Sequence, residues 1–454
     1  MVELLLAAAV FGVVSLGLIG TVIYGRESMA SSNDHDQGAY LAGEGLDAAR
    51  NIANSSYAAL TVGTHGITVS GGQWALSGTS DTTGIFTRVL TVASAGTNRL
   101  LVTSTVTWPL QGNGTGSVTL TARIGNWESN IKLWTNAVIS AYGNPTTTTN
   151  GVKVDTSGNY AYLTLSSTTN NFVVLDISNP AAPTIVKTIT VTNTPTNIMV
   201  SGNYAYVTTS TNTTCLEIVD ISVPSNASQV KSVTMTGAVS CNGVYVSGSF
   251  AYVGRNLSST AGANEFTVVN VSSPLLATVV GGYDAGIQLN EIWVSGTNAF
   301  VASSSTTNEM IVVNIATPTA PTLSKVYNPS TSLSALTITG YGNTVLLGMS
   351  TTLDIINVTT PTSPTRLGTF TAAGTINDVA ADITNQYAFL GTASTTGELQ
   401  IVNVGTPATP TLTKTVDVSG TTSTVTGVSY DASLDEVVGA SAFDTGELPI
   451  LTRN

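Results

Sequence analysis

GNYAYL (residues 158–163), GNYAYV (202–207) and GSFAYV (248–253) are copies of one motif, a turn followed by an aromatic and apolar stretch. Four weaker copies follow, GTNAFV (296–301), GNTVLL (342–347), NQYAFL (385–390) and LDEVVG (434–439). One position of the series recurs at intervals of 43 to 48 residues. It holds Tyr162, Tyr206, Tyr252, Phe300, Leu346, Phe389 and Val437. Seven copies of a unit of this length predict a β-propeller with seven four-stranded blades.

A second motif follows each of the first six copies, as in VVLDISNP (173–180) and EIVDISVP (217–224). The seventh copy ends early, at ELPILTRN, and so lacks one strand. We expect the missing strand upstream, within SNIKLWTNAVISAYG (129–143), where it would close the ring from the other end of the repeats. A six-bladed ring with an extra tail is the alternative. The units resemble the LVIVD-repeat propellers, and the resemblance covers residues 150–454.

The first 25 residues, MVELLLAAAVFGVVSLGLIGTVIYG, carry a single charge, that of Glu3. A helix over residues 4–25 would be about 33 Å long, enough to span a bilayer. A cleaved secretion signal would begin with basic residues, which are missing here. A plain membrane anchor accounts for the length but gives no reason for Glu3.

MVELLLAAAVFGVVSLGLIG resembles the N-terminal helix of type IV pilins and pseudopilins, in which a glutamate precedes an apolar helix. Gly12 matches the family's helix glycine, whereas Gly20 stands where many pilins have a proline. The resemblance implies that Glu3, Gly12 and Gly20 serve assembly, with Glu3 pairing with the N-terminal amine of a neighbouring subunit. It also implies a leader peptide upstream of Met1, an inner-membrane pool before assembly, and a prepilin peptidase and pilus assembly machinery as partners.

The pilin resemblance continues through LAGEGLDAARNIANSSY (41–57), which lies in an amphipathic stretch over residues 38–62. We expect one long helix over residues 1–62, ended by Gly63 and Gly66. Four alternating stretches in residues 63–128 then predict a small antiparallel sheet: QWALS, IFTRVLTVA, RLLVTSTVTW and SVTLTARI. The predicted fold is therefore an α+β pilin-like domain, a connector over residues 129–149, and an all-β propeller over residues 150–454.

Cys215 and Cys241 are the only cysteines. Both precede strands that begin on the same face of the predicted ring, which favours a disulfide; two free thiols are the alternative. Closing a loop of about 27 residues would stabilise the fold by about 3.5 kcal/mol.

Several repeats carry an asparagine or an acid just before the innermost strand. Blade geometry would gather these side chains around one mouth of the central channel, together with the loop over residues 255–265. They either cap the turns between blades or form a polar ring that binds an ion or a sugar. The candidates are Asn150, Asn197, Asn242, Asn290, Glu291, Asn377 and Asp378.

Composition excludes some functions. A net charge of −12 with only 14 basic residues argues against a nucleic-acid partner. The two histidines stand in no set of nucleophile, base and acid, so we expect no enzyme and no cofactor. Asp431 and Asp435 have a calcium-like spacing but lack the glycine and distal glutamate of a calcium loop, so a turn is the stronger interpretation.

These observations favour a structural protein, an extracellular homopolymeric filament subunit that displays its propeller for cell adhesion or contact with a glycan or surface ligand. A minor pilin at the filament tip, a secretion pseudopilin, and a membrane-anchored binding protein that does not polymerise are the alternatives.

Overall fold

The computed structural model describes residues 33–95, 99–110, 114–125, 134–143, 149–210, 213–329, 332–382, 384, 386–418, 424–442 and 446–453. They belong to two compact units, Met1–Lys132 and Leu133–Asn454. The predicted assembly residues Glu3, Gly12 and Gly20 lie outside the described residues. Within the described part of the chain, no helix is both long and apolar enough to cross a membrane.

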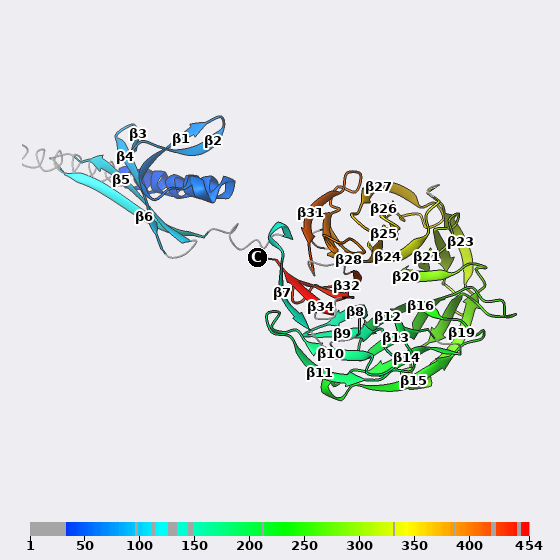
Figure 1. Ribbon diagram of the computed structural model, residues 1–454. Coiled ribbons are helices and arrows are strands. Elements are labelled where there is room, and N and C mark those ends of the chain that lie inside the picture. The colour runs from blue at the N-terminus through cyan, green and yellow to red at the C-terminus, as the bar shows by residue number, and fades with distance from the viewer. Residues whose placement is uncertain are drawn as a thin grey trace, which may run out of the picture. The chain divides into compact units, whose positions relative to one another are not determined.

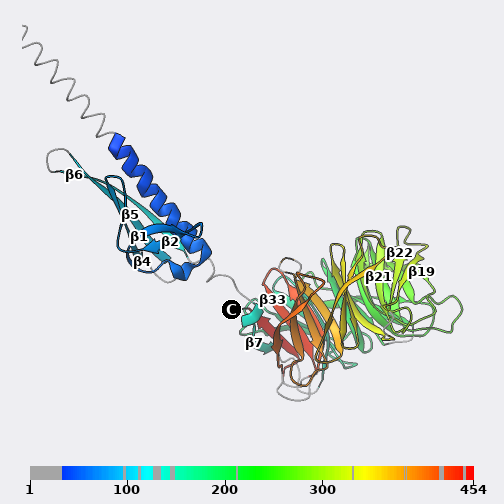
Figure 2. The same cartoon turned by 90° about the horizontal axis from the view of Figure 1, so that it is seen from above.

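The first unit is a helix packed against an antiparallel sheet (Figure 2). The helix covers residues 33–55 and buries Leu46, Ala49 and Ile52 against the sheet residues Leu90 and Val102. The sheet order is β2-β1-β4-β5-β6, with β3 paired to β4. Its strands are β1 (Gly63–Ser70), β2 (Gln73–Ser77), β3 (Asp81–Thr83), β4 (Phe86–Ser94), β5 (Arg99–Pro109) and β6 (Thr115–Gly125).

Arg88 ties the helix to the sheet. Its guanidinium lies 2.7 Å from Asp81, 2.8 Å from Glu44 and 2.9 Å from the carbonyl oxygen of Leu41. Burial alone would lower the pKa of Arg88, but its hydrogen bonds to the two carboxylates raise it overall. The guanidinium is therefore a buried, fully charged link between two elements.

Two details of the first unit differ from the prediction. The helix ends at residue 55, before the expected boundary at 62, and Tyr57–Ala59 form a short 3-10 helix, η1. Ser56, with φ −164° and ψ 116°, is already extended, in keeping with the low helix propensity of serine. Gly63 and Gly66 do not end the helix but lie within β1, so two strands, β1 and β3, add to the four predicted.

The second unit is built from seven four-stranded antiparallel sheets among the described residues, arranged around a centre (Figure 1). This is a β-propeller-like arrangement. The first four sheets comprise β8 (Gly151–Ser157), β9 (Tyr160–Leu165), β10 (Phe172–Asp176), β11 (Thr184–Ile189); β12 (Pro195–Ser201), β13 (Tyr204–Thr209), β14 (Thr214–Asp220), β15 (Ser228–Thr234); β16 (Cys241–Ser247), β17 (Phe250–Arg255), β18 (Phe266–Asn270), β19 (Thr278–Tyr283); β20 (Leu289–Ser295), β21 (Asn298–Ser303), β22 (Met310–Asn314) and β23 (Thr322–Tyr327).

The other three sheets comprise β24 (Ala335–Tyr341), β25 (Thr344–Met349), β26 (Thr352–Asn357), β27 (Thr365–Thr371); β28 (Ile376–Asp382), β29 (Tyr387–Thr392), β30 (Leu399–Asn403), β31 (Thr411–Val416); β32 (Val425–Asp431), β33 (Glu436–Ser441), β34 (Leu448–Thr452) and β7 (Val138–Gly143). Short 3-10 helices are η3 (Trp134–Asn136), η4 (Pro224–Asn226) and η5 (Pro274–Leu276).

The last sheet is completed from upstream. β7 pairs antiparallel with β34, from Gly143 opposite Leu448 to Val138 opposite Thr452. Just before β7, the buried Trp134 packs edge-on against Phe389, with ring centroids 4.7 Å apart, and the guanidinium of Arg453 lies 5.2 Å from the Trp134 ring centroid. The two ends of the second unit are therefore joined by a strand pair and an aromatic contact.

The core of the second unit lies between the sheets. The second and third strand of each sheet are buried almost throughout, as in β9, β10, β25 and β30. Both faces of these strands pack on neighbouring sheets, so their sequences are nearly continuous apolar runs. This explains why AYV-like and IVV-like runs mark the repeat so clearly in the sequence.

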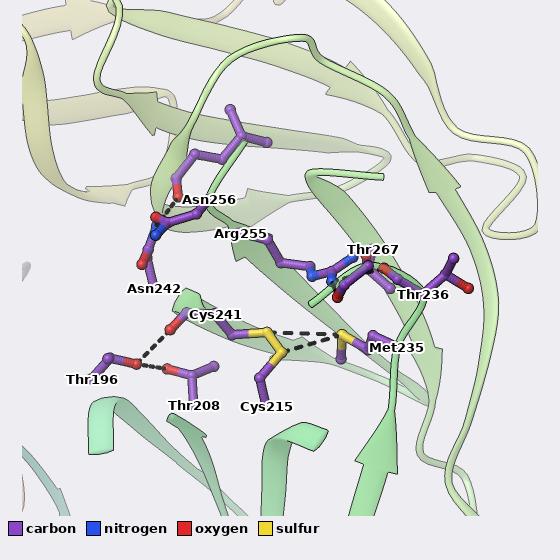
Figure 3. The surroundings of a disulfide bond; sticks show 12 residues. Thr196, Thr208, Cys215, Met235, Thr236, Cys241, Asn242, Arg255, Asn256 and Thr267 are labelled. Atoms are coloured by element: carbon purple, nitrogen blue, oxygen red, sulfur yellow. Dashed lines mark hydrogen bonds between the residues drawn. A yellow bond between two sulfur atoms is a disulfide. The ribbon is translucent and has the colours of Figure 1, made fainter. Parts of the chain in front are cut away.

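One position in each sheet, directly before or at the start of the third strand, can hold the segment that leads to the next sheet. We call it the clamp position. Asn171, Glu265 and Glu398 accept hydrogen bonds from backbone N–H groups 20 residues further along, at Val191, Ala285 and Val418. In the second sheet this position is Cys215, which forms a disulfide with Cys241 at the start of β16 (Figure 3). A covalent bond thus stands where other sheets use an amide or a carboxylate.

Candidate functional site: the central channel

The first strands of the seven sheets, β8, β12, β16, β20, β24, β28 and β32, line the centre of the ring. Each contacts the next, and β32 contacts β8. Each also has a register shift near its start, where one extra residue is inserted. Such a β-bulge re-aims the side chains that follow it. The residues around the channel therefore fall into layers.

The bulge residues fasten neighbouring sheets to one another. Asn242, Asn290 and Asn377 donate side-chain hydrogen bonds to the carbonyl oxygens of Leu289, Ala335 and Val425, at 2.7, 2.6 and 2.9 Å. Each acceptor belongs to the first strand of the next sheet. The hydroxyls of Thr196 and Thr426 do the same toward Cys241 and Gly151. Figure 3 shows the Thr196 contact and the Asn242–Asn256 pair.

The next layer is a polar network across the channel, which we call the plug: Lys153, Asn197, Glu291, Thr337 and Asp378. The Lys153 Nζ atom lies 2.8 Å from Asp378 and 3.4 Å from Glu291. The Asn197 amide donates to Glu291 at 3.0 Å, and the Thr337 hydroxyl lies within hydrogen-bond distance of both carboxylates. These five residues come from five different sheets, so the plug joins distant parts of the ring.

Backbone groups complete the plug. The N–H of Ile338 donates to Glu291 at 3.1 Å and that of Val428 to Asp378 at 2.8 Å. Burial raises the pKa of Asp378 to about 6, against the opposing effect of Lys153. Burial would lower the pKa of Lys153, but the charges of Asp378 and Glu291 raise it. In the plug a single cation, Lys153, therefore faces two carboxylates, Asp378 and Glu291.

Two cavities flank the plug and share Lys153, Asn197 and Glu291. The amide cavity, about 250 Å³, is lined by bulge residues that include Asn242, Asn290 and Asn377. The aromatic cavity, about 240 Å³, is lined by residues further along the same strands. Its wall includes Asp155, Met199, Tyr245, Trp293 and Ser429.

Asp155 is the remaining acid of the aromatic cavity. Its carboxylate accepts hydrogen bonds from the N–H groups of Val200 and Thr156, at 2.7 and 2.9 Å, and from the Ser429 hydroxyl at 3.2 Å. Burial raises its pKa to about 6, and the charge of Asp378 adds to that rise.

The predicted ring of seven residues thus splits into three groups. Asn242, Asn290 and Asn377 are bulge residues that join sheets, and Asn197, Glu291 and Asp378 belong to the plug. Asn150 is exposed, and its backbone N–H donates to the Ser166 hydroxyl at 3.2 Å. Lys153 and Asp155 were not among the residues predicted from the sequence. Aligning the repeat units on the bulge places Lys153 at the position equivalent to Asn197 and Glu291.

The loop between β17 and β18 is held at both ends. Arg255, 2% exposed, donates to the carbonyl oxygens of Asn264, Thr236 and Gly237, at 2.8 to 3.0 Å (Figure 3). At the other end, Glu265 accepts from the N–H of Ser258 at 3.1 Å. The loop contributes no residue to the lining of either cavity.

Asp431 and Asp435 form a turn. Asp431 accepts hydrogen bonds from the N–H groups of Ser433 and Leu434, and Asp435 pairs with Arg453 at 2.6 Å. These donors engage the Oδ1 atom of Asp431 and the Oδ2 atom of Asp435. Among the described residues, no group of three histidine, cysteine or acidic side chains is placed to hold a metal ion.

Comparison with known proteins supports the repeat fold. Residues 149–191, 195–235, 240–285 and 288–329 match the model of the LVIVD repeat. A chain in a solved structure titled "Crystal Structure of Mitotic Checkpoint Complex" is similar with a TM-score of 0.51 and 12% identity, over 70% of this chain and 94% of that one. At this identity the likeness concerns the fold alone. No curated protein matches the chain.

Proposed function

We propose that this chain is a structural subunit of a type IV pilus-like surface filament. Its N-terminal helix assembles with copies of itself, and its second unit is a closed seven-bladed propeller displayed outward for adhesion or surface contact. Before assembly the subunit resides in the inner membrane, where a prepilin peptidase processes it. Its role is structural and not enzymatic.

The observation that carries the proposal is the order of parts in the first unit. An apolar run with one carboxylate, Glu3, precedes a helix over residues 33–55 whose apolar face packs on an antiparallel sheet. This is the order of parts in the pilin family that the first residues resemble.

The second unit supports display outside the cell. A disulfide joins Cys215 and Cys241, and disulfides persist in oxidising compartments. The first strands of the seven sheets contact one another in a cycle, and β7 completes the last sheet by pairing with β34. A closed ring leaves few exposed sheet edges, which suits a module repeated many times along a polymer.

Glu3 would set the register of the polymer. A carboxylate in an apolar helix bundle costs several kcal/mol unless a cation pairs with it, and the N-terminal amine of the next subunit is such a cation. A subunit out of register would leave Glu3 unpaired.

The test is Glu3→Ala, with Glu27→Ala as the matched control outside the apolar run. We expect membrane-inserted, folded subunits and no sheared filaments for Glu3→Ala, and normal filaments for Glu27→Ala. Electron microscopy of sheared fibres and mass spectrometry of their N-terminal peptide provide the measurement. Filaments of normal length from Glu3→Ala would refute the proposal.

A second candidate is a minor subunit at the filament tip with an adhesive propeller, which the two cavities along the channel favour. The two candidates differ in abundance. A chain that makes up the bulk of sheared filaments is the major subunit; a few copies per filament would identify the tip subunit, and membrane-bound chains without filaments would identify a non-polymerising binding protein.

A further inference from the structure

We propose that the aromatic cavity binds an alkylammonium group, the cationic end of an amine or of a lysine side chain. The inference concerns the second unit alone and does not depend on filament formation.

Charge is the first argument. Asp155, Glu291 and Asp378 surround the cavity, and Lys153 is the one cationic side chain among the residues that line it. Lys153 is shared by Asp378 and Glu291, whereas Asp155 is held only by two N–H groups and one hydroxyl. Three carboxyl groups against one amine leave the lining with an excess of two acidic side chains. Buried charges in proteins are normally paired, and a cation entering the cavity would supply the missing partner.

The walls are the second argument. Tyr245 and Trp293 contribute aromatic surface and Met199 a thioether. Aromatic faces attract cations, and such surfaces also accommodate a short alkyl chain. Asp155, Met199 and Tyr245 are mostly buried but keep part of their surface exposed, so solvent reaches the cavity.

Size and geometry distinguish this ligand from the alternatives. A volume of about 240 Å³ is below the roughly 300–1,000 Å³ of pockets for drug-sized ligands, so it suits one small group. A bare metal ion would need several converging oxygens. Here the Glu291 and Asp378 oxygens are engaged by Lys153, Thr337 and backbone N–H groups. A neutral sugar would leave this excess of acidic side chains unpaired.

The titratable groups that face the cavity predict its pH dependence. Burial raises the pKa of Asp155 and that of Asp378 to about 6. Burial raises the pKa of Tyr245 and Tyr430, so both phenols stay neutral, and Lys153 stays charged because its pKa is raised. An alkylamine stays protonated below pH 8. Lowering the pH from 7.5 to 5 therefore removes negative charge from the cavity and none of the ligand's positive charge.

The experiment is isothermal titration calorimetry of n-pentylamine into the full chain in a mild non-ionic detergent, with n-pentanol as the uncharged isostere. We expect the amine to bind and the alcohol not to bind. Asp155→Asn should weaken amine binding roughly tenfold, or about 1.4 kcal/mol. Asp176→Asn, which removes an acid at the end of β10, should have no effect. In the unmodified chain, binding should weaken at pH 5 with the circular dichroism spectrum unchanged.

The same titration with Nα-acetyl-lysine N-methylamide separates the two sources of the ligand. Binding of both compounds admits a lysine side chain of a partner protein, and binding of pentylamine alone restricts the ligand to free amines. The proposal is overturned if pentylamine does not bind, if pentanol binds equally well, or if neither Asp155→Asn nor pH 5 weakens binding. Calcium or glucose binding in place of the amine would also overturn it.

Discussion

Replacing Lys153 with methionine tests whether the plug stabilises the ring. The Lys153 side chain is 14% exposed, and those of Glu291 and Asp378 are 16% and 8% exposed. Methionine keeps the length and the apolar stem of the side chain but leaves two buried carboxylates without their cation. Removing one partner of a buried ion pair costs about 3–5 kcal/mol, because the other charge is then uncompensated.

The pH dependence of this loss follows from Asp378. Its pKa is about 6 in the folded chain, against 3.8 as its ordinary value, mainly because of burial. A carboxyl whose pKa is raised on folding lowers the free energy of unfolding as the pH rises from about 4 to about 6. Without the opposing charge of Lys153 the pKa of Asp378 rises further. At pH 5 Asp378 is then mostly protonated, and the cost of Lys153→Met falls.

Urea unfolding of the full chain at pH 7.5 and at pH 5 measures both effects. We expect Lys153→Met to lower the free energy of unfolding by about 3–5 kcal/mol at pH 7.5 and by less than half as much at pH 5. The control is Lys187→Met, a half-buried lysine on the outermost strand β11, where we expect a change within about 0.5 kcal/mol at both pH values. A loss below 1 kcal/mol at pH 7.5, or an equal loss at both pH values, would refute the reasoning.

Three further predictions concern other contacts. Arg88→Met should expose the helix over residues 33–55 to hydrogen exchange and cost about 3–5 kcal/mol. Arg50→Met, which breaks an exposed pair with Asp47, should cost less than about 0.5 kcal/mol. Similar losses for both variants would contradict the role of Arg88 in linking the helix to the sheet. Trp134→Ala should cost about 3–5 kcal/mol in thermal unfolding, since the side chain is 1% exposed; no loss would contradict its role in closing the second unit. In urea unfolding at pH 7.5, Glu309→Gln should raise the free energy of unfolding by about 1 kcal/mol, whereas Glu265→Gln should lower it by about 2 kcal/mol. A loss of stability for Glu309→Gln together with a gain for Glu265→Gln would refute this contrast.

The repeat was readable from the sequence because the second and third strands of each sheet are buried on both faces. Burial keeps YAYV-like and IVVN-like runs apolar in six or seven copies, whatever the loops contain. Because the last repeat is one strand short of the others, its fourth strand was expected upstream of the repeats. β7 (Val138–Gly143) pairs with β34 at this position. The extent of the first helix was harder to predict, because Ser55 and Ser56 end it before any glycine does.

The channel was only partly predictable. Its asparagines could be seen, but the extra residue in each first strand separates Asn242 from Asn197 by one layer. The predicted set of asparagines and acids mixes residues of both layers, and the sequence alone does not separate them. The role of Lys153 could not be predicted because its partners, Glu291 and Asp378, lie 138 and 225 positions away in the sequence. Only the folded ring brings the three side chains together.

The residue at the clamp position, before the third strand, differs from sheet to sheet. The fixed element is a backbone N–H 20 residues downstream, which Asn171, Glu265 and Glu398 each meet with a side-chain oxygen. At Glu309 the same spacing leads to Pro329, which has no N–H, and both carboxylate oxygens of Glu309 lack a hydrogen-bond partner among the described residues. Burial raises the pKa of Glu309, so its ionised form destabilises the folded chain at neutral pH. The backbone geometry of the ring therefore persists where the clamp fails, because the apolar packing of the strands, and not any one polar contact, holds neighbouring sheets together.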